Sequence, residues 1–422
     1  MTRRWAWVLV VLGAGCGSNK GGDGLGGLGG GGGGSQPLCA SPTTAALDDP
    51  NTVALVVDSG PSTGPGYTNG LFATVTLCVP GTSTCQTIDH LLVDTGSMGV
   101  RVLESALTIQ LQAVTSEAGV PLAECTPFVD GTAWGPVKMA DVYVGGEIAS
   151  NIPIQTVGDE LTFTQVPSSC TGTPINNLND LGSNGILGVG VYKQDCGTAC
   201  SRAGQNAGLY YGCSSATACT PTAVPLAKQV PNPVAMFPVD NNGVIIQLPC
   251  LPAGGAPSAP GVMVFGIGTQ ANNGLGTAKA MPLDKRGFVT TAFPEDGASY
   301  TSFLDSGSNA LFFLNTSTSG IKQCTTKGLT DFYCPGSTLS LTATVSSGTD
   351  SVPIVFSVSN TQVLAKSPNY AFADIAGPMP GFPTDTTIPG FDWGLPFYFG
   401  RSVYTAIEGQ STPAGVGPYF GF

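Results

Sequence analysis

The chain is poor in charged residues and has a single histidine, and both shortages narrow its chemistry. Only 10% of its 422 residues are charged, against roughly 25% in typical globular proteins. With His90 alone, no zinc site can be built from three histidines, and a Ser-His-Asp triad would have to use that one residue. Residues 266–268 (GIG) lack the third glycine of a dinucleotide-binding loop. No metal or cofactor is therefore expected.

Positive charge and long apolar runs are also scarce. There are 15 Lys and Arg residues against 27 Asp and Glu, which gives a formal net charge of −12. Nucleic acid is not an expected partner, because phosphate neutralisation needs clustered basic side chains. The acidity favours solubility outside the cell. Beyond the N-terminal segment, no stretch approaches the roughly 18 uninterrupted apolar residues of a membrane helix.

Turn formers and apolar residues are plentiful. The chain has 60 Gly, 33 Pro and 42% hydrophobic residues, enough for a sizeable core. This composition predicts β-structure with few long helices, and residues 363–366 and 402–408 are short helix candidates. Predicted strands are rich in Val, Ile, Thr or Phe and are mostly bounded by turn residues. They are residues 53–57, 72–79, 87–93, 142–144, 244–247, 262–265, 339–345 and 352–358.

The first 16 residues, MTRRWAWVLVVLGAGC, have the pattern of an export signal. Two arginines precede a short apolar run, and small residues precede Cys16. The segment resembles a bacterial lipoprotein signal, which implies lipidation of Cys16 and a protein anchored in the membrane of the bacterial cell envelope, at the outer membrane or cell surface. Residues 17–49 begin with a glycine-dominated stretch and predict a flexible tether.

The cysteine count supports export. Of 13 cysteines, setting Cys16 aside leaves an even number, compatible with up to six disulfides. Cys78 and Cys85 flank a predicted hairpin turn, and Cys324 and Cys334 could close a second local loop. The alternative is a zinc cluster, but there is no CxxC pair and the compartment is oxidising, so disulfides are favoured. The remaining cysteines include a cluster of Cys196, Cys200, Cys213 and Cys219, with Cys250 downstream.

One motif occurs in both halves of the chain. The copies are LLVDTGSMGVRVL at residues 91–103 and SFLDSGSNALFFL at residues 302–314. Each follows a predicted hairpin and places Asp, Thr or Ser, Gly and Ser before a mostly apolar run. A later apolar-apolar-Gly segment also occurs in each half, at residues 186–188 and 398–400. The repetition predicts an N-terminal lobe over residues 50–195, a Cys-rich connection over 196–260 and a C-terminal lobe over 261–422.

The repeated motif carries a possible chemistry. The glycine allows a tight turn close to the carboxylate, and the following serine can donate its hydroxyl to it. If the loops meet across a pseudo-two-fold axis, Asp94 and Asp305 lie together and share a proton, because two adjacent carboxylates cannot both ionise cheaply. One carboxylate could then activate a water while the other polarises or protonates a carbonyl. This chemistry needs no metal, histidine or covalent nucleophile.

These motifs resemble the pepsin-like aspartic peptidases, two-lobed all-β enzymes with one catalytic Asp per lobe, and more narrowly an uncharacterised bacterial lipoprotein family near that clan. The resemblance implies a bilobal, all-β double barrel with pseudo-two-fold symmetry. It also implies a monomeric aspartic endopeptidase that cleaves peptides or unfolded proteins without a cofactor. The implied catalytic pair is Asp94 and Asp305. The implied supporting network consists of Thr95, Gly96, Ser97, Ser306, Gly307 and Ser308.

Residues 128–146 resemble the flap hairpin of these enzymes. The implied flap residues are Asp130, Gly131, Thr132 and Trp134. The family places a Tyr before the Gly-Thr pair, where this chain has Asp130. Trp134 could replace it as an apolar lid, or could be an ordinary packed hairpin residue. The altered flap keeps two alternatives open: a catalytically inactive pepsin-fold binding module at the surface, and a structural β-rich lipoprotein with no cleft.

Overall fold

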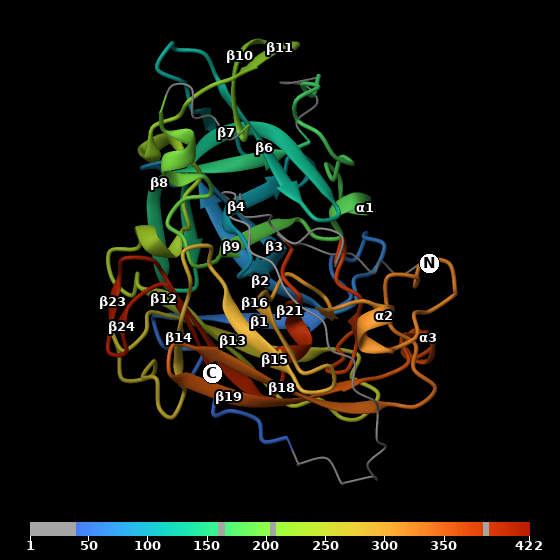
Figure 1. The fold of residues 1–422 in the computed structure, drawn as a ribbon. Coiled ribbons are helices and arrows are strands. Elements are labelled where there is room, and N and C mark those ends of the chain that lie inside the picture. Colours follow the sequence, from blue (N-terminus) through green and yellow to red (C-terminus); the bar gives the residue numbers. More distant parts are fainter. Residues whose placement is uncertain (1–38, 159–164, 203–207, 383–387) are drawn as a thin grey trace.

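Strands dominate the computed structural model, which describes residues 39–158, 165–202, 208–382 and 388–422 (Figure 1). A closed six-stranded barrel and a half-barrel form two lobes, which confirms the all-β, two-lobed prediction. Within the described ranges, no helix is long and apolar enough to cross a membrane. The predicted export signal with Cys16, and residues 17–38 of the predicted tether, lie outside the described residues.

The strands of the first half build the N-terminal lobe and the start of the central sheet. They are β1 (Thr52–Asp58), β2 (Gly70–Cys78), β3 (Cys85–Asp94), β4 (Met98–Leu103), β5 (Gln112–Ala113), β6 (Leu122–Phe128), β7 (Gly131–Val144), β8 (Glu147–Val157), β9 (Gly185–Val189), β10 (Tyr210–Ser215) and β11 (Ala218–Pro221).

The later strands complete the central sheet and the C-terminal lobe. They are β12 (Gly243–Leu248), β13 (Ala259–Phe265), β14 (Ala280–Pro282), β15 (Val289–Phe293), β16 (Ala298–Leu304), β17 (Leu311–Phe313), β18 (Leu339–Ser347), β19 (Asp350–Val358), β20 (Ala376–Gly377), β21 (Phe391–Trp393), β22 (Arg401–Ala406), β23 (Ser411–Thr412), β24 (Gly415–Val416) and β25 (Tyr419–Gly421).

The helices are single turns. They are α1 (Leu178–Leu181), α2 (Thr316–Ser319) and α3 (Thr361–Leu364), with 3₁₀ turns η1 (Glu104–Ala106), η2 (Gly197–Cys200), η3 (Leu226–Lys228), η4 (Val234–Met236) and η5 (Leu395–Phe397). All eight predicted strands overlap observed strands, and the helix predicted at 363–366 overlaps α3. The helix predicted at 402–408 is wrong, because β22 occupies that segment and pairs with β12 on one side and β25 on the other.

The two motif copies have the same strand topology. In the N-terminal lobe, the β2–β3 hairpin leads to Asp94, β9 runs parallel to β3, and β4 runs antiparallel to β9. In the C-terminal lobe, the β15–β16 hairpin leads to Asp305, β21 runs parallel to β16, and β17 runs antiparallel to β21. Each aspartate is thus delivered by a strand that is flanked by a hairpin partner and a parallel strand.

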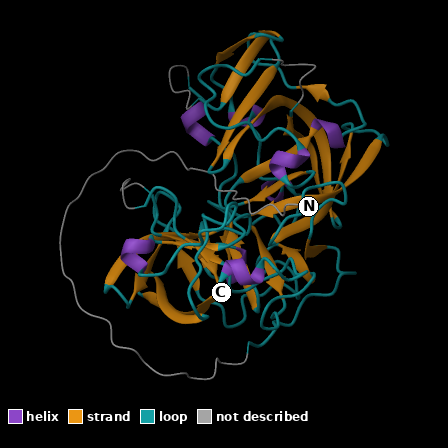
Figure 2. Ribbon diagram, turned by 90° about the vertical axis from the view of Figure 1, so that its right-hand side faces the viewer, coloured by secondary structure: helices purple, strands orange, loops and turns teal. Residues whose placement is uncertain are grey.

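A central sheet joins the lobes. β1 pairs with β13, and β12 continues the sheet through β22, β25 and β14 (Figures 1 and 2). The stretch expected as a connection, residues 196–260, contributes strands of its own: β10 pairs with β6 in the N-terminal lobe, and β12 belongs to the central sheet.

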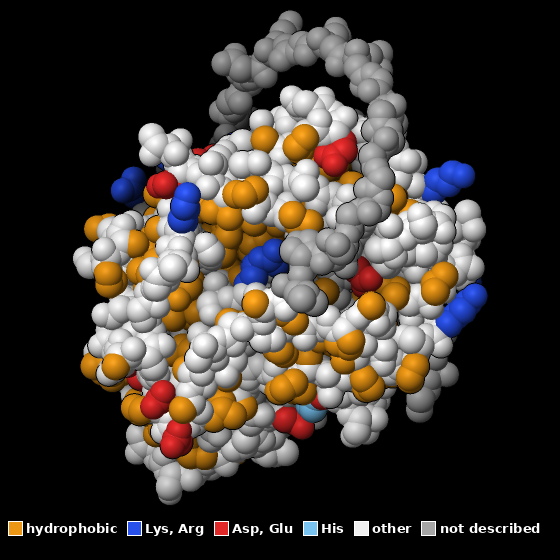
Figure 3. Space-filling model, turned by 90° about the horizontal axis from the view of Figure 1, so that it is seen from below, with side chains coloured by type: hydrophobic (Ala, Val, Ile, Leu, Met, Phe, Trp, Pro, Cys, Tyr) orange, Lys and Arg blue, Asp and Glu red, His pale blue; other side chains and the backbone are white. Residues whose placement is uncertain are grey.

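Every cysteine of the described residues is in a disulfide, as predicted. The pairs are Cys39–Cys250, Cys78–Cys85, Cys125–Cys170, Cys196–Cys200, Cys213–Cys219 and Cys324–Cys334. The Cys39–Cys250 bridge fastens the last part of the expected tether to the body, where the Ala45 amide also donates to Gln247. The low charge content is visible on the face in Figure 3, where few charged side chains interrupt hydrophobic and neutral areas.

Candidate active site

The two repeated aspartates lie together between the lobes. Asp94 is the last residue of β3, and Asp305 directly follows β16. A Cβ placed on Gly96 would lie 2.8 Å from the Asp305 Cγ, and one placed on Gly307 would lie 2.8 Å from the Asp94 Oδ1. Each loop's glycine therefore faces the other loop's carboxyl, and a side chain at either position would collide with it.

Reciprocal hydrogen bonds tie the loops to each other. The Thr95 amide donates to the Ser306 Oγ at 3.1 Å, and the Ser306 amide donates to the Thr95 Oγ1 at 2.9 Å. The Ser306 hydroxyl continues to the Val93 carbonyl at 2.7 Å. The Thr95 Oγ1 lies 2.8 Å from the Tyr398 hydroxyl. Because these bonds cross between segments 211 residues apart, they hold the two carboxyls in a defined relative position.

Each carboxyl has the same local donors. The Gly96 amide donates to the Asp94 Oδ1 at 2.8 Å, and the Ser97 hydroxyl donates to the Asp94 Oδ2. In the other lobe, the Gly307 amide donates to the Asp305 Oδ1 at 2.8 Å, and the Ser308 hydroxyl donates to the Asp305 Oδ2 at 2.8 Å. The structure thus brings together all eight predicted residues of the pair and its supporting network.

The two acids differ in how strongly their surroundings raise the pKa. Burial raises the pKa of Asp305 well above its ordinary value, and the nearby charges of Asp94 and Asp392 add to the effect. Burial also raises the pKa of Asp94, but hydrogen bonds from Asp305, Ser97 and Gly96, and the charge of Arg101, oppose it. The surroundings therefore disfavour ionisation of Asp305 more strongly than ionisation of Asp94.

A third acid, Asp392, lies beside the pair and was not selected from the sequence. It is 2% exposed, and a hydrogen bond joins its carboxyl to Ser308. Burial raises its pKa well above the ordinary value. Even so, no group of three or more His, Cys, Asp or Glu side chains among the described residues is arranged to hold a metal ion.

The position of Asp392 corrects one motif assignment. By resemblance to pepsin-like enzymes, the apolar-apolar-Gly segments at 186–188 and 398–400 are expected to run behind the two loops, but the segment behind the second loop is 392–394, on β21 and its end. The first lobe matches the expectation, with Gly188 opposite Asp94. A search for an apolar-apolar-Gly pattern missed residues 392–394 because the first position is occupied by an acid, Asp392. Tyr398 lies close by in another role, as the partner of Thr95.

A second unpredicted group lies behind Asp94. Arg101 on β4 is 1% exposed and donates to the Glu124 Oε1 at 2.6 Å and to the Met98 carbonyl at 2.5 Å. Asp195 lies 3.4 Å from the same guanidinium and accepts hydrogen bonds from the Tyr210 hydroxyl. Burial and the neighbouring Glu124 raise the pKa of Asp195 well above its ordinary value. The signal that could have revealed this group in the sequence was the charge of Arg101 inside the apolar run that follows the first motif.

The hairpin expected to act as a flap is built into the N-terminal lobe. β10 pairs with β6 along its outer edge, and the Cys125–Cys170 bridge fastens β6 to a crossing segment. The half-buried Asp130 lies at the hairpin turn, and a Cβ on Gly131 would lie 2.3 Å from the Thr173 carbonyl. The β10 pairing and the disulfide thus fasten the β6 strand of this hairpin to other parts of the chain.

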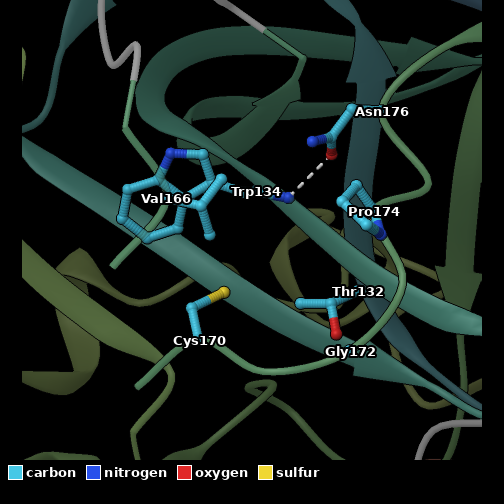
Figure 4. Close-up of a pocket in the computed structure, with 7 residues that line it drawn as sticks. All are labelled: Thr132, Trp134, Val166, Cys170, Gly172, Pro174 and Asn176. Atoms are coloured by element: carbon cyan, nitrogen blue, oxygen red, sulfur yellow. Dashed lines mark hydrogen bonds between the residues drawn. The ribbon is translucent and has the colours of Figure 1, made fainter. Parts of the chain in front are cut away.

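Thr132 and Trp134 belong to a small pocket of their own. The other lining residues are Val166, Cys170, Gly172, Pro174 and Asn176 (Figure 4). The Trp134 amide donates to the Asn176 Oδ1 at 3.0 Å, and the indole is 3% exposed, packed edge-on against Tyr211 at 5.3 Å. None of the lining residues belongs to the two aspartate loops. Trp134 is thus a packed hairpin residue, the second of the two expected roles.

Access to the pair is narrow in this structure. Both aspartates are 0% exposed. Among Asp94–Ser97 and Asp305–Ser308, only Gly96 is partly exposed. Gly96 also lies against the Asp305 carboxyl.

Comparison with known proteins places the chain in a family. A family model described as a protein of unknown function (DUF3443) matches residues 48–422. The chain belongs to this family. Its fold is similar to the crystal structure of an aspartic proteinase from Irpex lacteus, with 13% sequence identity, a TM-score of 0.50, and coverage of 88% of this chain and 96% of that chain. That likeness shows a pepsin-like fold for this DUF3443 protein. No curated protein matches it.

Proposed function

We propose that the protein is an aspartic-type endopeptidase that hydrolyses peptide bonds with a water activated between Asp94 and Asp305. The observation that carries the proposal is the face-to-face contact of the two loops, in which each glycine abuts the opposite carboxyl. The pepsin-like fold supports it, although a fold by itself does not define a function.

The proposed chemistry follows from the difference between the two acids. Asp94, the more readily ionised member, takes a proton from the water as the oxygen attacks the scissile carbonyl carbon. Asp305, which holds the shared proton, gives it to the carbonyl oxygen, so that a neutral tetrahedral intermediate forms. The Gly96 and Ser97 donors stabilise the ionised Asp94 before the reaction. Extended peptide would bind between the lobes.

Cleavage of unfolded protein tests the proposal. Purified protein is incubated with a reduced, alkylated substrate from acidic to neutral pH, with and without a statine-type inhibitor. Cleavage should be inhibited, and Asp94→Asn or Asp305→Asn should abolish it. Asp374→Asn is the matched control, because it removes another acid of raised pKa, bound to Ser359 in the C-terminal lobe. Absence of cleavage by the wild type, or full activity in Asp94→Asn, would refute the proposal.

A second candidate is a catalytically inactive pepsin-fold module that binds peptide at the cell surface. The zero exposure of both acids and the fastened hairpin favour it. Equilibrium binding of a labelled peptide library would then survive Asp305→Ala, without any turnover. Turnover by the wild type would exclude this candidate.

The location is a separate proposal that rests on the sequence. Lipidation of Cys16 would anchor the protein in the bacterial envelope, with the glycine-rich residues as a spacer. Expression of the full chain with a labelled fatty acid should label the wild type and leave Cys16→Ser unlabelled and released from the membrane fraction. Equal labelling of both proteins would contradict the anchor.

A further inference from the structure

The shared topology allows the two lobes to be compared position by position. In the N-terminal lobe, Ile186 on β9 lies opposite Leu92 on β3 and Arg101 on β4. In the C-terminal lobe, Asp392 on β21 lies opposite Phe303 on β16 and Phe312 on β17.

These positions are equivalent. Leu92 and Phe303 both stand two residues before the aspartate of their loop, and Arg101 and Phe312 both stand seven residues after it. Each lobe therefore carries one charged residue at this three-strand position, a cation behind Asp94 and an acid behind Asp305.

Sheet geometry directs Asp392 toward the second acid. Residues paired across neighbouring strands project from the same face, and side chains two apart on one strand share a face. Asp392 pairs with Phe303, which is two residues before Asp305, so both carboxyls lie on one face. In the N-terminal lobe, the equivalent Ile186 is a 1% exposed core residue that packs with Leu92. An apolar residue thus fits this backbone position, and the fold alone does not require an acid there.

Ser308 lies between the two acids. Its hydroxyl donates to the Asp305 Oδ2 at 2.8 Å, and the same side chain acts on Asp392, where it lowers the pKa against the larger effect of burial. The Asp392 Oδ1 is buried without a hydrogen-bond partner among the described residues. An ionised carboxylate there would pay a large desolvation cost.

The surroundings of Asp94 have the opposite sign. The charge of the buried Arg101 guanidinium acts on Asp94 and favours the ionised carboxylate. Asp392 acts on Asp305 in the other direction: burial disfavours ionisation of both acids, and once Asp392 ionises at rising pH its charge favours the protonated form of Asp305. The further titratable group that faces this cluster is Tyr398, on which all three acids act.

We propose that Asp392 is a positioning residue which, with Arg101 on the opposite side, breaks the symmetry of the pair so that Asp305 holds the shared proton and Asp94 is the base. This inference deepens the proposed peptidase function and rests on it. It assigns fixed roles to two acids whose own loops are nearly identical in their hydrogen bonds.

The pH profile of cleavage tests this role. Asp392→Asn keeps the shape of the side chain, and Asp392→Ile installs the residue that the N-terminal lobe has at the same position. Both should move the alkaline limb of kcat/KM to lower pH by about one unit, because a coupling of this size is typical of interacting acids. The acidic limb, which reports Asp94, should stay in place. Asp374→Asn should leave both limbs unchanged, and unmoved limbs in both Asp392 variants would overturn the proposal.

A second measurement does not depend on activity. The unfolding free energy is measured from pH 4 to 8 for the full chain and for Asp305→Asn, Asp392→Asn and the double variant. A buried acid of raised pKa loses stability as pH rises above its unfolded pKa, so each single variant should flatten the pH dependence. Coupled acids should give non-additive effects. Additive effects would overturn the coupling. If the wild type cleaves nothing but the cycle is non-additive, only the peptidase proposal fails.

Discussion

The two lobes present their aspartates on the same backbone but pack different chemistry behind them. Behind Asp94 lies a polar network centred on Arg101, with Glu124 and Asp195. Behind Asp305 lies an aromatic cluster in which Phe391 stacks on Trp393 at 5.5 Å. Disulfides are also uneven. Four bridges join residues within the N-terminal part of the chain, and one, Cys324–Cys334, lies in the C-terminal lobe.

The difference shows which features the paired acids require. Both lobes keep the strand that ends at the aspartate, its parallel neighbour, and the Gly and Ser donors. The two lobes differ in the side chains that pack behind these strands. The backbone arrangement thus brings the carboxyls together, and the residues behind them set their electrostatics.

The largest effect should come from the glycines at the contact. Gly96→Ala and Gly307→Ala each place a methyl group within 2.9 Å of the opposite carboxyl. We expect either change to lower kcat by roughly 100- to 10,000-fold, the usual range for loss of acid–base catalysis. Gly336→Ala, with no atom within 4 Å of the added carbon, is the control. Near-normal turnover in only one of the two variants would show that the lobes are not equivalent at this contact.

The second-largest difference between the lobes should come from Arg101, the buried cation of the N-terminal lobe. Arg101→Met leaves the Glu124 charge without its partner and should lower the unfolding free energy by about 3–5 kcal/mol. The equivalent change in the other lobe, Phe312→Met, strands no charge and should cost about 1.5 kcal/mol or less. Urea unfolding of both variants measures the difference. Equal losses would mean that the polar network contributes nothing specific to the N-terminal lobe.

The stability that each disulfide contributes should depend on the size of the loop that it closes. Replacing Cys125 and Cys170 with alanine removes a bridge that spans 45 residues, and the C-terminal pair Cys324 and Cys334 spans 10. Losses of roughly 2–4 kcal/mol are expected, with the larger loss for the longer loop. Calorimetric unfolding of the two double variants compares them. The reverse order would argue against a chain-entropy origin.

The smallest expected effect is a pH dependence at the turn between β7 and β8. Burial, with the Asp240 carboxylate, raises the pKa of Glu147 to about 7. Stability from the protonated side chain is complete below the ordinary glutamate pKa of about 4.3 and is lost as pH rises through 7. Glu147→Gln should therefore gain stability relative to the wild type between pH 5 and 8, whereas the exposed control Glu117→Gln should not. The prediction would be contradicted if the urea midpoints of Glu147→Gln and the wild type differed by the same amount at pH 5 and at pH 8.

Much of the fold could be predicted from local pattern. Strands rich in β-branched residues and bounded by turn formers were found because those preferences act within a few residues. The Cys78–Cys85 and Cys324–Cys334 bridges were within reach for the same reason, since each closes a short loop. The Cys39–Cys250 bridge was not, because its cysteines meet only after the chain has folded.

The errors share a non-local cause. Residues 402–408 form a strand because β12 and β25 pair with it on both sides, which local propensity does not register. The flap assignment of residues 128–146 stays a prediction, and the structure adds that β10 and the Cys125–Cys170 bridge fasten this hairpin from distant parts of the chain. Asp392 was overlooked because its importance comes from its neighbour across the sheet.

The sequence by itself determined that this is a β-rich, disulfide-bonded chain with two copies of one aspartate loop, because composition and a repeated motif are local properties. Only the tertiary structure decided that each loop's glycine lies against the other loop's acid. It also decided that Arg101 and Asp392, on non-equivalent strands, lie in the corresponding three-strand layer of the two lobes. Those relations depend on strand register between distant segments, and charge acts through space rather than along the chain.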